Sequence, residues 1–96
     1  MDDRRFETRL RRCDPVDLVW NDQTGKKHSR GSELTDISSS GAAVRADSPL
    51  RVGTKVSFGY RSQTLVGKVK HCIKRGGGFL IGIEFDSDRG WSFRTP

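Results

Sequence analysis

Short segments in which apolar and polar residues alternate recur along this chain. In VDLVW, Val16, Leu18 and Trp20 share one face at the two-residue period of a β-strand. The same alternation predicts strands over GAAVRA (41–46), KVSFGY (55–60), TLVGKVKHCI (64–73) and FLIGIEF (79–85), with HSRGSELTDI (28–37) as a weaker candidate. In the fourth segment, the alternating face carries Leu65, Gly67, Val69, His71 and Ile73. No segment shows the period of a helix.

Turn residues separate these segments. They cluster in NDQTG (21–25), DISSSG (36–41), DSP (47–49) and the glycines at 76–78. Strands that recur with turns between them predict an all-β fold, an antiparallel sheet closed into a barrel. Gly59, Gly67 and Gly82 lie inside strand segments and suit the bends or bulges that closure requires. At 96 residues we expect one domain with a modest core.

The distribution of charged residues sets the N-terminal segment apart from the rest of the chain. Residues 1–12 hold five arginines and three acids without apolar periodicity, which predicts a flexible arginine-rich arm before a barrel over 13–96. The net charge of +6 indicates an anionic partner or a solvated surface, and charge alone favours the surface. The charged start lacks the apolar core of a secretion signal, and no apolar run is long enough to span a membrane. We therefore expect a reduced, cytoplasmic protein with no membrane insertion.

Potential metal ligands and nucleophiles are scattered. The spacing of Cys13, His28, His71 and Cys72 matches no compact zinc pattern. His71 and Cys72 are neighbours on a predicted strand, so their side chains should point to opposite faces. No motif links either histidine to the serines of the 36–41 turn. The sequence thus predicts no metal site and no enzyme.

The arm carries the first binding signal. RRFETR places Arg4 and Arg5 together and Arg9 four residues after Arg5. Guanidinium groups bind phosphate with two hydrogen bonds, stack on aromatic rings and match the O6 and N7 acceptors of guanine. A flexible arm with several arginines can therefore wrap a ligand that contains phosphates and purines. When the arm is considered alone, generic polyanion binding or plain solubility is the preferred explanation.

DISSSG supplies a second signal. Asp36 would repel phosphate, but a carboxylate accepts two hydrogen bonds side by side, which suits the N1–H and exocyclic amine of guanine. Ser38 can donate to a phosphate oxygen or pair with a base edge, and Gly41 lets the loop turn where a side chain would obstruct it. The competing interpretation is a simple turn in which Asp36 bonds to Ser38.

RRFETR followed by DISSSG resembles the bipartite signature of PilZ domains, an R-x-x-x-R arm and a D-x-S-x-x-G loop. In this sequence these are Arg5 and Arg9, then Asp36, Ser38 and Gly41. VGKVKHC and GGFLIGIEF resemble the closing strands of that family, so the similarity covers roughly residues 4–86. Many PilZ domains continue into a C-terminal helix, whereas eleven residues follow Phe85 here. Trp91 and Phe93 in that tail are expected to pack against the barrel.

The resemblance implies a six-stranded antiparallel barrel and a bacterial receptor for cyclic di-GMP. Arg5 and Arg9 would clamp guanine edges and phosphates, while Asp36, Ser38 and Gly41 would form the barrel side of the site. An arginine in the position of Arg4 tends to accompany a dimeric ligand, which predicts two cyclic di-GMP molecules per chain and no other cofactor. Ligand binding would order the arm and signal to an unknown protein partner, with no DNA or RNA involved. The alternatives are a PilZ-like adaptor that binds no nucleotide and a small barrel that binds RNA or single-stranded DNA.

Overall fold

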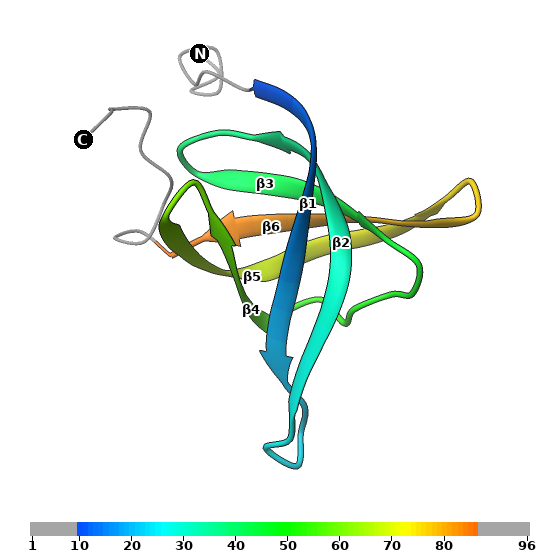
Figure 1. Cartoon of the computed structure of the whole chain (residues 1–96). Helices are drawn as coiled ribbons and strands as arrows, with labels where there is room; N and C mark the ends of the chain where they lie inside the picture. Colours follow the sequence, from blue (N-terminus) through cyan, green and yellow to red (C-terminus); the bar gives the residue numbers. More distant parts are fainter. Residues whose placement is uncertain (1–9, 87–96) are drawn as a thin grey trace, which may run out of the picture.

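The computed structural model describes residues 10–86 and forms a closed, six-stranded antiparallel barrel, as predicted (Figure 1). The strand order around the barrel is β1-β2-β3-β6-β5-β4. The strands are β1 (Leu10–Asn21), β2 (Lys27–Ile37), β3 (Gly41–Ala46), β4 (Lys55–Tyr60), β5 (Gln63–Arg75) and β6 (Gly78–Phe85). The described residues contain no helix long and apolar enough to cross a membrane.

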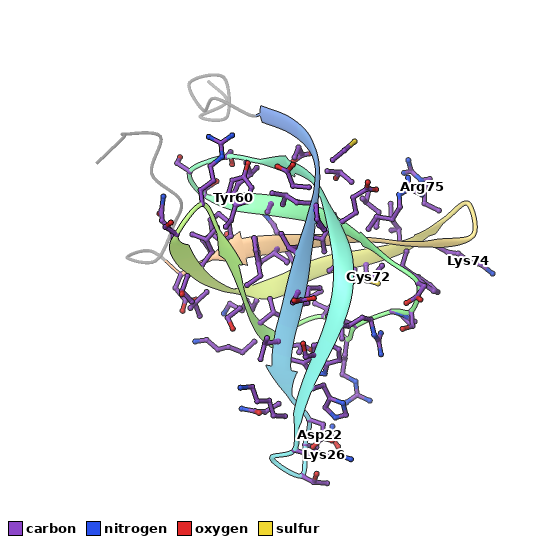
Figure 2. The ribbon with its side chains drawn as sticks, viewed as in Figure 1. Asp22, Lys26, Tyr60, Cys72, Lys74 and Arg75 are labelled. Atoms are coloured by element: carbon purple, nitrogen blue, oxygen red, sulfur yellow. The ribbon has the colours of Figure 1, made fainter. Side chains whose placement is uncertain are left out.

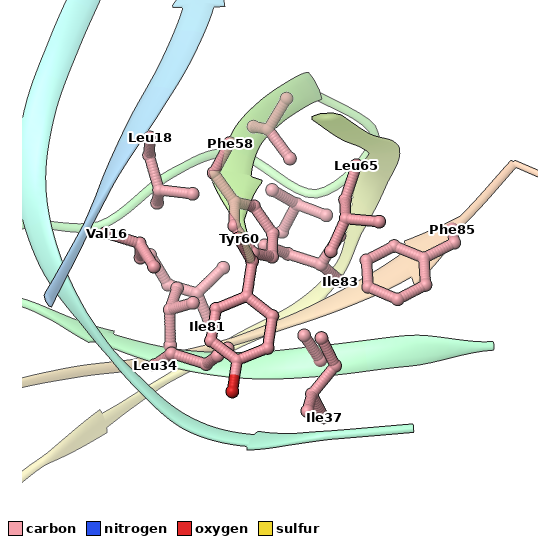
Figure 3. Packing of buried hydrophobic residues seen from close by; sticks show 14 of the residues in the cluster. Val16, Leu18, Leu34, Ile37, Phe58, Tyr60, Leu65, Ile81, Ile83 and Phe85 are labelled. Carbon is pink, nitrogen blue, oxygen red and sulfur yellow. The ribbon is translucent and has the colours of Figure 1, made fainter. Parts of the chain in front are cut away.

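Alternate residues of every strand fill the barrel interior (Figure 3). The apolar faces of β1, β4 and β6 point inward as the sequence pattern predicts, and Trp20, Leu50 and Cys72 pack against the core from its margin. Tyr60 lies in this core with 7% of its surface exposed, and its hydroxyl reaches the edge of the apolar cluster. The core comprises Val16, Leu18, Leu34, Ile37, Ala42, Val44, Ala46, Val56, Phe58, Tyr60, Leu65, Val69, Ile81, Ile83 and Phe85.

Two strands extend further than the turn chemistry predicts. Asp36 and Ile37 belong to β2, as the strand candidate over 28–37 predicted, so the turn expected over 36–41 is reduced to the short connection before Gly41. Ile37 is fully buried, and the burial of this apolar side chain holds the end of β2 in the sheet. β1 begins at Leu10 and therefore includes three residues of the segment assigned to the arm. The tail with Trp91 and Phe93 lies outside the described residues.

A β-bulge in β5 changes which side chains face the core. The register shifts between Val69 and His71, so the alternation expected along this strand is wrong beyond Val69. After the bulge Cys72 packs against the core, whereas Ile73 is 41% exposed. His71 is exposed and its ring occupies the space that a side chain on Gly82 would need. Gly82 thus accommodates the bulge, as predicted for glycines inside strands.

Candidate functional site

Asp36 lies near the end of β2, between two neighbouring strands. Its Cα partners are Arg11 on β1 and Ala43 on β3. A bulge at Thr35 precedes it, and the Thr35 hydroxyl donates a hydrogen bond to the carbonyl of Ala43 at 3.1 Å. Leu34 and Ile37, on either side of Thr35 and Asp36, are fully buried, while Asp36 itself is half-buried. The sheet therefore holds this carboxylate at a fixed position on the barrel.

Ser38 closes the connection between β2 and β3. Its backbone N–H donates to the carbonyl of Gly41 at 2.8 Å, and its hydroxyl lies 3.4 Å from the same oxygen. The side chain is fully buried. The N–H of Phe85 donates to the carbonyl of Ser40 at 2.8 Å, which attaches the connection to the end of β6. In this conformation the hydroxyl of Ser38 stabilises the loop from within.

Gly41 is required by the close approach of two strands. A Cβ atom at this position would lie 2.5 Å from the backbone oxygen of Ile83 on β6. Backbone atoms cannot move away as a flexible side chain could, so any larger residue would push β3 from β6. The glycine of DISSSG thus sets the distance between the loop and the barrel wall, in addition to any freedom that it gives the turn.

The arginines predicted to bind the ligand, Arg4, Arg5 and Arg9, lie outside the described residues. The structure does define where the chain leaves them: Leu10 pairs with Ile37, and Arg11 pairs with Asp36. The first residues of β1 therefore lie beside the end of β2 that carries Asp36.

A polar contact that the sequence did not reveal lies further along β1. The hydroxyl of Tyr60 donates to a carboxylate oxygen of Asp14 at 3.2 Å, and the guanidinium of Arg61 lies 5.5 Å from the centre of the Tyr60 ring. Asp14 and Tyr60 are separated by 46 residues, so no local pattern could predict their pairing. Arg61 and Ser62 turn the chain with positive φ angles of 49° and 67°, which is uncommon for residues other than glycine.

A second polar cluster lies on the hairpin between β1 and β2, at the opposite end of β1 (Figure 2). The rings of Trp20 and His28 stack with centroids 5.4 Å apart, and Arg30 lies 5.2 Å from the centre of the Trp20 ring. Asp22 accepts from the backbone N–H and the hydroxyl of Thr24, and it lies 2.8 Å from His28. The Thr24 hydroxyl and then His28 hold the pKa of Asp22 well below its usual value. These contacts stiffen the hairpin.

The cysteines and histidines do not gather at one place. His71 is exposed and Cys72 packs against the core, so these neighbours lie on opposite faces as expected. Cys13 is exposed on β1, and His28 belongs to the Trp20 stack. Within residues 10–86, no three side chains of the metal-binding types form a group that could hold an ion.

The described barrel therefore carries a half-buried carboxylate, Asp36, next to a connection whose approach to β6 requires a glycine. The sequence profile of the PilZ domain matches residues 3–90, and the chain belongs to the PilZ family. PilZ domains bind cyclic di-GMP and are ligand receptors, not enzymes. A comparison with curated proteins gave no match.

Proposed function

We propose that this protein is a cyclic di-GMP receptor that holds the dinucleotide between Arg4, Arg5 and Arg9 on one side and the Asp36–Gly41 segment on the other. The pairing of Arg11 with Asp36 is the observation that carries the proposal. Arg9 is two residues before Arg11, and an extended chain spans at most about 3.6 Å per residue. Arg5 and Arg9 can therefore both reach a ligand seated against Asp36, at no more than roughly 22 Å and 7 Å along the chain from Arg11.

Asp36 gives the proposed site its preference for guanine. The carboxylate is half-buried, so a hydrogen bond to it is less weakened by water than one on an open surface. Guanine presents two adjacent donors, N1–H and the exocyclic amine, that a carboxylate accepts together. A carboxylate disfavours a bare phosphate at the same place, which separates this site from a generic polyanion surface.

Ser38 and Gly41 support the site through the shape of the loop. The hydroxyl of Ser38 faces the Gly41 carbonyl, and Gly41 lets β3 approach Ile83. Both contacts hold the chain that follows Asp36. The contact predicted between Ser38 and a phosphate stays a prediction, and the buried hydroxyl supports a role in fixing the loop.

Both halves of the proposed site are needed because ordering the arm costs conformational entropy, about 1–2 kcal/mol for each residue fixed. Hydrogen bonds to charged groups contribute about 1.5–3 kcal/mol each. A single arginine contact cannot offset the ordering of several residues, whereas several contacts can. The ordered arm would then present a new surface to a protein partner, which is how we propose that the signal is passed on.

Calorimetric titration with cyclic di-GMP tests the proposal. Wild-type protein should bind, while Arg5→Ala and Arg9→Ala should lose detectable binding with unchanged melting temperatures, since both side chains precede the barrel. Arg51→Ala is a matched control because Arg51 is an exposed arginine on the loop between β3 and β4. Absence of binding to the wild type would favour the adaptor without nucleotide. Tighter binding to an oligonucleotide than to cyclic di-GMP would favour a barrel that binds RNA or single-stranded DNA.

A further inference from the structure

β5 projects beyond the strand that pairs with one of its edges (Figures 1 and 2). The register with β4 ends at Lys55 and Lys68, and the last backbone hydrogen bonds on that side join Val69 to Gly53 and Thr54 at 2.8 and 2.9 Å. In the segment 70–75, residues 71–75 pair with β6 on the other edge, and Lys70 lies at the bulge before them. Within residues 10–86 no strand pairs with the β4 side of this segment, which we call the β5 edge.

The register identifies which backbone groups the β5 edge presents. Arg75 and Gly78 flank a two-residue turn in which Gly76 has a φ of 62°, so this pair exchanges the hydrogen bonds that close the hairpin. In an antiparallel ladder, hydrogen-bonded pairs alternate with pairs whose N–H and C=O groups point away. Ile73 therefore bonds to β6, whereas the N–H and C=O groups of Cys72 and Lys74 point to the open side.

The side chains of the β5 edge give it a definite charge. Lys70, Lys74 and Arg75 are exposed, and β5 contains no acid between Gln63 and Arg75. Ile73 adds an apolar side chain that is 41% exposed. Lysine on an edge strand disfavours pairing with a second copy, because two such edges would bring like charges together. The same charges attract an acidic strand.

We propose that the β5 edge binds an extended acidic segment of a partner protein as an additional β-strand. The outward backbone groups of Cys72 and Lys74 would supply the ladder hydrogen bonds, and Ile73 would meet an apolar side chain of the partner. Acidic residues on the partner strand would pair with Lys70 and Lys74. A nucleic acid could use the charges but could not continue the backbone ladder, which distinguishes the two kinds of ligand.

This surface is separate from the proposed nucleotide site. Asp36 lies on β2, and β3 and β6 lie between β2 and β5 in the barrel. Neighbouring strands are about 4.8 Å apart, so three spacings place the β5 edge roughly 14 Å from Asp36 around the sheet. Binding of a partner strand at the β5 edge therefore does not depend on cyclic di-GMP.

Amide hydrogen exchange of the free protein tests the edge itself. The amides of Cys72 and Lys74 should exchange fast, at least tenfold faster than those of Ile73 and Arg75, which bond to β6. Equal, slow exchange at all four positions would show that the edge is already covered and would overturn the proposal.

Binding is tested by NMR titration with a capped eight-residue peptide in which Glu and Val alternate (the Glu peptide). The control is a peptide of the same length in which Lys replaces every Glu (the Lys peptide). The Glu peptide should slow the exchange of the Cys72 and Lys74 amides and shift their resonances, while the Lys peptide should not. Lys74→Pro removes the outward N–H and leaves the bonds to β6, because proline is tolerated on the open side of an edge strand. Lys74→Ala removes the same charge and keeps the N–H.

Lys74→Pro should therefore bind the Glu peptide at least tenfold more weakly than Lys74→Ala. Equal affinities, shifts confined to other strands, or no binding at peptide concentrations up to several millimolar would overturn the proposal. So would tighter binding of a single-stranded oligonucleotide at the same residues. If Lys74→Pro does not fold, the charge reversal Lys70→Glu with Lys74→Glu replaces it and should transfer binding from the Glu peptide to the Lys peptide. Unchanged peptide preference in that variant would equally refute the acidic partner.

Discussion

The hydroxyl of Tyr60 donates a hydrogen bond to Asp14 across 3.2 Å and thereby ties β4 to β1. These two strands close the barrel, yet their register contains one pair of residues, Val19 and Ser57. The Tyr60–Asp14 contact joins β1 and β4 at a second point. This point lies between Val19 and Leu10 in β1, toward the residues that pair beside Asp36. This contact therefore supports the closure of the barrel near the residues of β1 that pair beside Asp36.

Tyr60→Phe should lower the free energy of unfolding by about 1 kcal/mol, since it removes one hydrogen bond to a partly exposed carboxylate. For a domain of this size the melting temperature should fall by about 4–8 °C. Thermal unfolding of Tyr60→Phe, Asp14→Ala and the double variant measures the coupling between the two side chains, because alanine leaves no acceptor at position 14. If the effects of the two single substitutions simply add, the contact contributes nothing to closure.

Asp36→Ala should weaken cyclic di-GMP more than a cyclic dinucleotide that carries adenine. The carboxylate accepts from two adjacent donors of guanine, and adenine does not present the same arrangement. Parallel titrations with both ligands give the ratio of affinities, and Asp47→Ala serves as a control at an exposed acid. Equal losses for both ligands would instead assign Asp36 to holding the loop.

Gly41→Ala should destabilise the barrel by about 1–3 kcal/mol, in the range of overpacking substitutions. The new methyl group would lie 2.5 Å from the Ile83 backbone oxygen. The resulting separation of β3 from β6 should also lower the affinity for cyclic di-GMP. Gly77→Ala is the matched control, because a Cβ there would meet no atom within 4 Å. Denaturant unfolding compares the two variants, and a Gly41→Ala protein as stable as Gly77→Ala would contradict the steric argument.

Arg4→Ala should change the stoichiometry of binding from two cyclic di-GMP molecules per chain towards one. Cyclic di-GMP associates as an intercalated dimer that exposes outer guanine faces, and a third guanidinium can stack on such a face while Arg5 and Arg9 bind phosphates and base edges. The end point of a calorimetric titration reports the ratio directly. A wild-type end point at one nucleotide per chain would refute the dimeric ligand and leave the receptor proposal standing.

The hairpin of Asp22 should contribute a stability that depends on pH. Its hydrogen bonds with Thr24 and His28 hold its folded pKa below the usual 3.8, so the ionised form favours folding. This contribution is present above pH 3.8 and is lost as the pH falls through the folded pKa. The difference in melting temperature between wild type and Asp22→Asn, measured from pH 7 to pH 2, should therefore shrink below about pH 4. A difference in melting temperature that stays constant over this pH range would contradict it.

The sequence alone determined that the fold is all-β, because side chains that alternate with a period of two lie on one face of a strand, which lets a sheet bury Leu18, Phe58 and Ile83 on the same side. It also marked Asp36 and Gly41 as candidate ligand residues through their spacing within DISSSG. These features are local, since each depends on residues that are close in the chain.

Only the tertiary structure decided where the pattern breaks and which distant residues meet. The bulge before His71 turns Ile73 outward and Cys72 inward, because a shift of one residue exchanges the two faces of a strand. The sequence assigned Asp36 both to the strand candidate over 28–37 and to the turn over 36–41, and pairing with β1 and β3 decided for the strand. The contact of Tyr60 with Asp14, the need for Gly41 beside Ile83 and the open β5 edge all follow from strand pairings between remote segments. Each of these features exists only once the barrel has closed, so it cannot be derived from any local segment of the sequence.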